Sequence, residues 1–208
     1  MYQGPNFFHS IRIQPPEKEI YARLGFRKGI TELNPAERDA INRTIEDAAG
    51  LVSIKGAARV MGLRSVGENG VTLEDETVLP SRALAVMLAG SSGVLLMGAT
   101  AGPDVMEAIA SCSMGDLTRA VILDAVASEM TDAALSWIMD YVGQDLLRSA
   151  RRLTRKRFSA GYGDFSLENQ WDIYTLLSLG SIGITMTPTC VLIPEKSVTA
   201  VAGVLSLT

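Results

Sequence analysis

The chain has 208 residues, of which 47% are hydrophobic and 20% are charged, a balance typical of one folded globular domain and unlike that of disordered or fibrous chains. Its formal net charge of −4 provides no positive field to attract nucleic acid or an anionic membrane, so neither is expected as a partner. Cys112 and Cys190 lie far apart and form no C-x-x-C pair, which argues against a disulfide framework or a thiolate metal site.

The N-terminal residues show neither the basic segment nor the continuous apolar segment of a secretory signal. No run in the sequence reaches the roughly 18 apolar residues that a membrane-spanning helix needs. Together with the unpaired cysteines, these features predict a protein of the reducing cytoplasm.

The first 33 residues are expected to form an N-terminal arm on a single domain that covers residues 1–208. Within this arm, the short apolar stretch from Phe7 to Ile13 predicts a strand. Pro15 and Pro16 end that strand, because proline has no backbone N–H to donate. A short helix is predicted from Glu17 to Leu24.

A clear helix start follows at Asn34, because this residue can cap, Pro35 suits the first helical position and Glu37 can bond back to the cap. The helix is predicted to run from Pro35 to about Ala49 and to close at Gly50.

The next segment carries signals for a hairpin, a helix and a buried strand. β-branched residues between Leu51 and Val78 predict strands around a turn at Asn69-Gly70, a dipeptide that favours positive φ angles. A helix is predicted from Pro80-Ser81 to about Ala89. The unbroken apolar run from Val94 to Thr100 is typical of a central strand covered on both faces.

Two helices are predicted after this strand. Gly102-Pro103-Asp104 opens a short one, which Met114-Gly115 breaks. Asp116 is the expected cap of a longer one, whose apolar positions recur at three- and four-residue steps as far as Leu147. Six cations are predicted to form the end of this helix, where they suit its negative pole and make a local basic patch: Arg148, Arg151, Arg152, Arg155, Lys156 and Arg157.

The last part of the chain is predicted to contain a loop, a helix and two strands. The loop covers residues 158–165. Ser166 is the expected cap of a helix that reaches about Leu179 and ends at Gly180. From Ile182 to Leu207 the pattern predicts two strands, interrupted by Pro188 and Pro194.

The sequence contains no pattern typical of a metal site, a His-dependent catalytic triad or a nucleotide-binding loop. His9 is the only histidine and no Asp, Glu or Cys cluster has the spacing of metal ligands, so neither a metal site nor a His-dependent triad is expected. The pieces Gly90-Ser91-Ser92-Gly93 and Gly98-Ala99-Thr100-Ala101-Gly102 match neither the dinucleotide fingerprint nor the P-loop, and are interpreted as tight turns. No catalytic residue is assigned.

One segment stands out as a candidate binding site, Arg157-Phe158-Ser159-Ala160-Gly161-Tyr162. A guanidinium at the start of an irregular loop, a glycine that allows close backbone approach and an aromatic ring together suit a small zwitterion that carries a planar base. Two further pieces follow along the chain, Ile184-Thr185 and Pro194-Glu195-Lys196-Ser197-Val198.

The order R-x-x-x-G-Y, a short capped helix, I-T and P-x-x-S-V resembles the S-adenosylmethionine loop and closing strands of the reactivation domain of cobalamin-dependent methionine synthase. Gly102-Pro103, Gly115-Asp116 and the run from Ala120 to Ala125 resemble the central part of stand-alone relatives, so the similarity spans roughly residues 90 to 205. It implies an α+β fold, a single domain with a twisted, mainly antiparallel sheet flanked by helices.

By this resemblance, Arg157 holds the methionine carboxylate of S-adenosylmethionine, the Ser159 backbone contacts the ligand, and Gly161 and Tyr162 shape the loop beside the corrin. The chain would dock over cobalamin carried by a separate corrinoid protein or methyltransferase. There, one-electron reduction by a flavodoxin-like or other donor and methyl transfer from S-adenosylmethionine restore methylcobalamin. The resemblance thus implies a free-standing reactivation subunit in methionine synthesis, an accessory part of a methyltransferase that acts only with its partner.

Three pieces depart from the family pattern. Gly163-Asp164-Phe165-Ser166 stands where the fused enzymes have Pro-Ala-Cys-Pro, Arg151 where an acidic residue is expected, and Ala200-Val201-Ala202 where an aromatic pair is expected. Losing a carboxylate and rings near a sulfonium favours weaker binding. Two alternatives therefore stay open: a docking or scaffold protein that contacts a corrinoid protein through the Arg148 to Arg157 patch, and an unrelated small-molecule enzyme on a similar fold.

Overall fold

The computed structural model describes residues 4–27 and 29–207, which are built around a seven-stranded sheet. The strand order is β4-β3-β2-β5-β9-β6, with β1 beside β2, and each of these pairings is antiparallel. This topology confirms the predicted α+β class with its mainly antiparallel sheet. The strands are β1 Asn6–Phe8, β2 Lys55–Val66, β3 Gly70–Leu73, β4 Val78–Pro80, β5 Gly93–Thr100, β6 Arg151–Phe158 and β9 Ser197–Ser206.

Strand β5 is the centre of the fold, because every one of its residues is buried. β2 pairs along one edge of it and β9 along the other. Its side chains alternate between two apolar clusters, with Leu95 and Met97 in the cluster under α5 and Val94 and Leu96 in the cluster on the opposite face. The predicted doubly covered central strand is confirmed.

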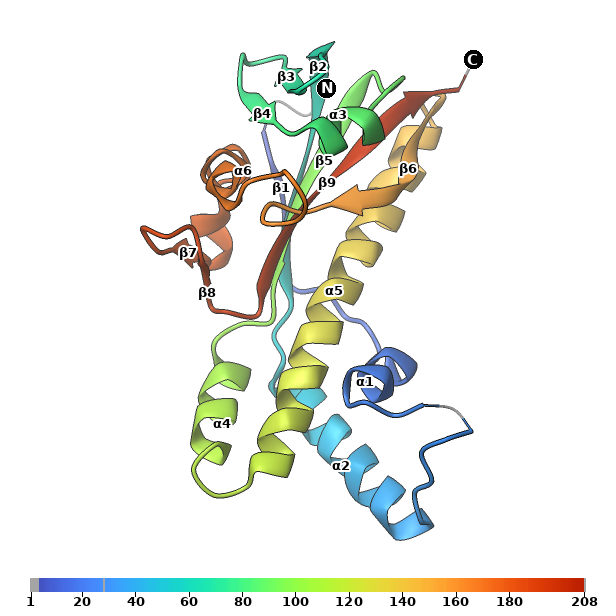
Figure 1. Cartoon of the computed structure of the whole chain (residues 1–208), viewed down its shortest axis with the longest axis vertical. Helices are drawn as coiled ribbons and strands as arrows, with labels where there is room; N and C mark the ends of the chain where they lie inside the picture. The colour runs from blue at the N-terminus through green and yellow to red at the C-terminus, as the bar shows by residue number, and fades with distance from the viewer. Residues whose placement is uncertain (1–3, 28, 208) are drawn as a thin grey trace.

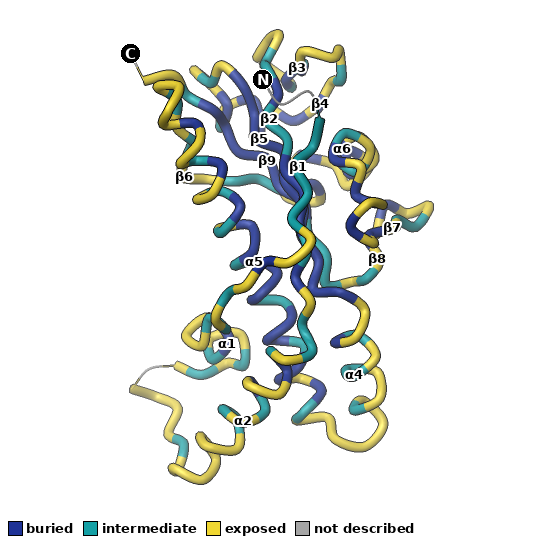
Figure 2. Tube along the Cα trace, turned by 180° about the vertical axis from the view of Figure 1, so that it is seen from behind, coloured by how far each residue is buried: buried dark blue, intermediate teal, exposed yellow. Residues whose placement is uncertain are grey.

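Helix α5 covers one face of the sheet and continues beyond its end, where α1, α2 and α4 gather around it (Figure 1). Helices α3 and α6 belong to the cluster on the other face. Figure 2 shows the buried residues as a continuous band along the sheet and the inner side of α5. The helices are α1 Glu17–Arg23, α2 Pro35–Leu51, α3 Arg82–Met87, α4 Asp104–Cys112, α5 Leu117–Leu147 and α6 Gln170–Leu177.

Two of the three predicted helix caps, Asn34 and Asp116, are confirmed in atomic detail. The Asn34 side chain accepts from the Glu37 amide at 2.9 Å and the Glu37 side chain accepts from the Asn34 amide at 3.0 Å, which forms a capping box. Asp116 caps α5 by accepting from the Arg119 amide at 2.9 Å. The predicted stop at Gly50 is wrong, because α2 continues through this residue to Leu51.

The N-terminal strand is shorter than predicted. β1 ends at Phe8, although the Ile11 amide still donates to the Ile54 carbonyl at 3.0 Å as the chain leaves the sheet. The α1 helix then packs against α5 through Ile20, which is fully buried.

The prediction that six cations after Leu147 form a helix end is correct for Arg148, the C-cap of α5, and wrong for the other five. The left-handed backbone of Ala150 (φ 51°) reverses the chain just after α5, and Arg151–Phe158 becomes the edge strand β6. The strand forms because β9 needs a partner on its outer side: Leu153 pairs with Val204 and packs against the cluster under α5. The five cations after Arg148 therefore lie along a strand rather than at the end of a helix.

The C-terminal segment also differs from its prediction. The Ser166 hydroxyl donates to the Glu168 side chain instead of capping, and a 3-10 turn, η1 Leu167–Asn169, precedes α6. A second 3-10 turn, η2 Leu179–Ile182, runs through Gly180. Three strands follow instead of two, because the small hairpin of β7 Thr185–Met186 and β8 Leu192–Ile193 precedes β9.

Candidate functional site

The candidate site begins where β6 ends beside β9. The ladder between these strands is regular to Leu153, is interrupted, and resumes with Arg157 opposite Ala202. Within the interruption, the Thr154 hydroxyl accepts from the Gly203 amide at 2.9 Å. An irregularity of this kind changes the direction in which side chains point, and it places the Arg157 side chain against α5.

The Arg157 guanidinium binds residues of α5. It donates to the Asp132 carboxylate at 2.6 Å, to the Asp132 carbonyl at 3.3 Å and to the Ser136 hydroxyl at 3.0 Å. The Arg157 side chain is 24% exposed and that of Asp132 58%. A cation and an anion thus lie side by side, with the anion open to solvent.

The loop after Arg157 forms a tight, internally bonded turn. Gly161 has a φ of +89°, which suits glycine, and its amide donates to the Phe165 carbonyl at 2.7 Å. Tyr162 and Phe165 form an isolated antiparallel bridge, and the Tyr162 amide lies 3.4 Å from the Ser159 carbonyl. The Tyr162 side chain points outward, since 68% of this residue is exposed.

Two anchors hold this turn on the body of the protein. Phe165 is fully buried and stacks on Phe158 with ring centroids 6.0 Å apart. Asp164 accepts from the Ser81 hydroxyl at 2.6 Å and from the Arg82 amide at 2.7 Å, both at the start of α3. These hydrogen bonds, that of Ser81 foremost, lower the pKa of the Asp164 carboxyl below its ordinary value of 3.8.

The structure places Arg157 at the end of β6, with its side chain on α5, and Ser159, Gly161 and Tyr162 in the loop that follows, which is anchored to α3 and to the apolar cluster on the other face of the sheet. Sequence reasoning missed Asp132, which lies 25 residues earlier. Asp132 and Ser136 are four residues apart, so the sequence shows that they share one face of α5. Nothing in the sequence shows that β6 lies beside that face of the helix.

The chain is similar to a known domain in structure but not in sequence. No protein-family model matches it, and no curated protein matches it in sequence. A solved structure described as the MetH reactivation domain bound to AdoHcy matches with a TM-score of 0.69, covering 96% of this chain and 78% of that one at 12% sequence identity.

The chain has the fold of the MetH reactivation domain. At 12% identity the likeness concerns the fold alone, and it confirms the architecture that the motif order implied. The AdoHcy is a ligand of that solved structure. The roles of Arg157, Ser159, Gly161 and Tyr162 stay predictions.

Two cavities lie near the start of β2, where Ser53 and Lys55 line both of them. One, of about 330 Å³, is lined by Lys55, Thr100 and the start of α4, and the other, of about 320 Å³, by residues of the N-terminal arm that include His9 and Arg12. Neither is lined by the four predicted site residues.

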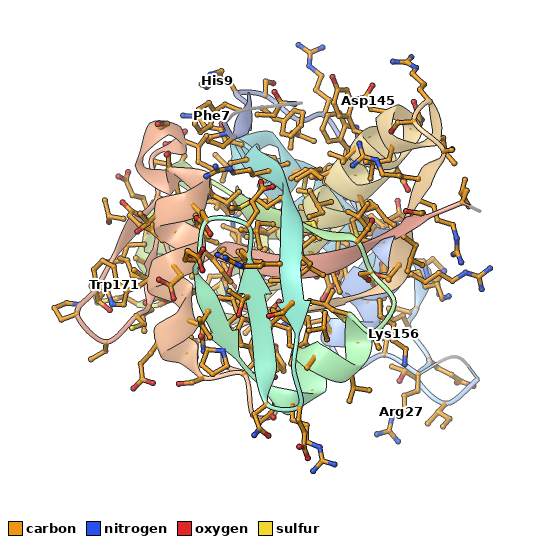
Figure 3. All side chains as sticks on the ribbon, turned by 90° about the horizontal axis from the view of Figure 1, so that it is seen from above. Phe7, His9, Arg27, Asp145, Lys156 and Trp171 are labelled. Atoms are coloured by element: carbon orange, nitrogen blue, oxygen red, sulfur yellow. The ribbon has the colours of Figure 1, made fainter. Side chains whose placement is uncertain are left out.

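Figure 3 shows Lys156 of β6 and Trp171 of α6 on opposite sides of the molecule. In residues 4–27 and 29–207, no three His, Cys, Asp or Glu side chains lie close enough to hold a metal ion. No helix in those ranges is both long and apolar enough to cross a membrane.

Proposed function

We propose that this chain is a reactivation module that binds S-adenosylmethionine and supports the reductive methylation of cobalamin on a corrinoid methyltransferase partner in methionine synthesis. The observation that carries the proposal is the Arg157–Asp132 pair, at the point where the chain enters a glycine-containing loop, on the fold of a domain described as bound to AdoHcy.

The pair is complementary to the head group of an α-amino acid. A guanidinium offers parallel N–H donors to a carboxylate, and a carboxylate accepts from an ammonium group. Three hydrogen bonds already engage Arg157, which has five N–H donors, so donors remain for a ligand. A partly exposed ion pair contributes only about 0 to 1 kcal/mol, so its rearrangement around a ligand costs little.

The loop supplies the remaining contacts for a nucleoside. Gly161 has no side chain to obstruct backbone approach, and the backbone of Ser159 belongs to the same turn, since its carbonyl accepts from the Tyr162 amide. The exposed ring of Tyr162 offers a flat apolar face to an adenine or to the edge of a corrin. The chain's own residues bind and orient, whereas the bound S-adenosylmethionine supplies the methyl group.

Cobalamin itself is assigned to the partner, and the electron to a flavodoxin-like or other reductant. The chain contributes a surface that places the ligand beside the corrin, and Tyr162 is the side chain on that surface most open to a partner. This division of labour makes activity dependent on both proteins.

Calorimetric titration with S-adenosylmethionine tests the proposal. Wild-type protein should bind saturably, and Arg157→Ala should bind more than about 30-fold more weakly, because removing one partner of a charge-assisted contact costs roughly 2 to 5 kcal/mol. Arg155→Ala is the matched control, since this exposed arginine is on the same strand. Equal binding by the two variants, or silence in wild type with and without a cobalamin-loaded corrinoid protein, would overturn it.

A second candidate function is docking without ligand chemistry. Its observation is the basic edge, defined as Arg148, Arg151, Arg152, Arg155 and Lys156, on and beside the outermost strand of an acidic protein. In the part of the chain that the structure describes, Arg148 alone among them forms a salt bridge, to Asp145. Such a patch suits an acidic face on a corrinoid protein.

The salt dependence of association and the effect of mutations on it distinguish the two functions. Docking through the basic edge predicts that Arg152→Glu with Arg155→Glu abolishes association with the corrinoid protein, and that added salt weakens wild-type association. Association that survives both changes would exclude this surface as the docking site.

A further inference from the structure

The Asp164 carboxylate accepts hydrogen bonds at the start of α3, a helix that lies about 80 residues earlier in the sequence. One carboxylate oxygen accepts from the Ser81 hydroxyl at 2.6 Å, and the other accepts from the Arg82 amide at 2.7 Å. The Ala83 amide lies 3.3 Å from both oxygens. Because Ser81 also accepts from the Leu84 amide at 2.9 Å, the first turn of α3 is satisfied by two side chains, one of them from the candidate loop.

The contact matters because the loop turns at two glycines. Gly161 and Gly163 both have positive φ angles, and glycines give a chain many alternative conformations. The amide of Gly161 donates to Phe165, so the turn is closed only if Phe165 stays in place. Asp164 lies directly between these glycines and that buried ring.

Asp164 and Phe165 hold the loop from two different directions. The Phe165 ring inserts into the cluster between the sheet and α6, whereas the Asp164 carboxylate reaches along the surface to α3. Tyr162, with its side chain exposed, is the residue whose position these anchors define.

We infer that Asp164 is the positioning residue of the candidate site: by binding the start of α3, it orders the loop of residues 158–165 before any ligand arrives. The inference rests on the proposed function for its ligand, but the ordering itself is a property of the chain alone. A loop ordered in advance spares the ligand the free-energy cost of ordering it, so the benefit appears in affinity.

The ionised state of Asp164 agrees with this role. Its hydrogen bonds hold its pKa below the ordinary value, so the carboxylate keeps both acceptor oxygens throughout the neutral range. The donors that bond to it at the start of α3 are one hydroxyl and two backbone amides.

Three variants test the inference. Asp164→Ala removes the contact, and Asp164→Asn keeps one acceptor oxygen and should rescue part of the effect. Asp116→Ala is the matched control, because it removes a capping carboxylate from α5, remote from the loop. The two readouts are hydrogen exchange of the amides in residues 159–165 and calorimetric titration with S-adenosylhomocysteine.

We expect faster exchange across residues 159–165 in Asp164→Ala, intermediate exchange in Asp164→Asn and no change there in Asp116→Ala. We also expect about tenfold weaker S-adenosylhomocysteine binding in Asp164→Ala, with Asp116→Ala matching wild type. Unchanged loop exchange in Asp164→Ala would overturn the positioning role, and so would unchanged affinity in a wild type that binds. Silence of the wild type in the titration would instead count against the proposed function, while the exchange result would still decide whether Asp164 orders the loop.

Discussion

Leu179 of η2 lies directly against Gly98 of β5, so that a Cβ atom added at residue 98 would come within 2.9 Å of its Cδ2. This contact joins η2 to the centre of the sheet, with Gly98 in register between Ala57 of β2 and Thr199 of β9. The glycine is needed for space rather than for backbone freedom, since its φ is not positive.

Gly98→Ala should therefore destabilise the protein. Inserting a methyl group into a packed core typically costs about 1 to 3 kcal/mol, and chemical denaturation would measure the loss of unfolding free energy. Gly50→Ala is the control, because nothing lies within 4 Å of its added Cβ in α2, where alanine gains roughly 0.5 to 1 kcal/mol. A Gly98→Ala variant as stable as wild type would contradict the close packing of η2.

The buried contact between Gln170 and Thr199 gives a second prediction. The Thr199 hydroxyl donates to the Gln170 side chain at 2.7 Å, and the amide nitrogen of Gln170 donates to the Cys190 carbonyl at 3.2 Å. Thr199→Val keeps the shape but leaves a buried acceptor without its donor, at a cost of about 1 to 3 kcal/mol. Thr189→Val, at an exposed position, should change the unfolding free energy little.

The sequence predicted the elements whose signals are local. An unbroken apolar run identified β5, periodicity and Asp116 identified α5, and Asn34 with Glu37 identified the start of α2. These features depend on residues within a turn or two of one another, so the chain need not be folded for them to be recognised.

The features that the sequence could not predict depend on distant partners. The run from Arg151 to Phe158 is a strand only because β9 lies beside it, and its cations gave no hint of that pairing. Asp132 contacts Arg157 only because β6 lies beside α5. Asp164 binds Ser81, which lies 83 residues earlier in the chain. Periodicity carries no information about such contacts.

The pH dependence of the loop should follow Asp164. Because the pKa of this carboxyl is lowered in the folded protein, its contribution to stability is complete above the ordinary value of 3.8 and is lost as the pH falls through the lowered pKa. Hydrogen exchange of residues 159–165 should therefore accelerate only in strong acid. Asp164→Asn should remove this acid response, and a response that persists in the variant would assign it to another group.

Asp132→Asn tests whether the pair with Arg157 binds a ligand or only joins β6 to α5. Since Asp132 is 58% exposed, the ion pair itself should contribute about 0 to 1 kcal/mol, and the variant should unfold nearly as wild type does. If Asp132 accepts the ammonium group of S-adenosylmethionine, the same change should weaken binding by about 10- to 100-fold, because a hydrogen bond to a charged group is worth roughly 1.5 to 3 kcal/mol. Asp145→Asn, which breaks the Arg148 pair farther along α5, is the control and should bind normally. A loss of stability with unchanged affinity would make the pair a structural contact and move the ligand away from Arg157.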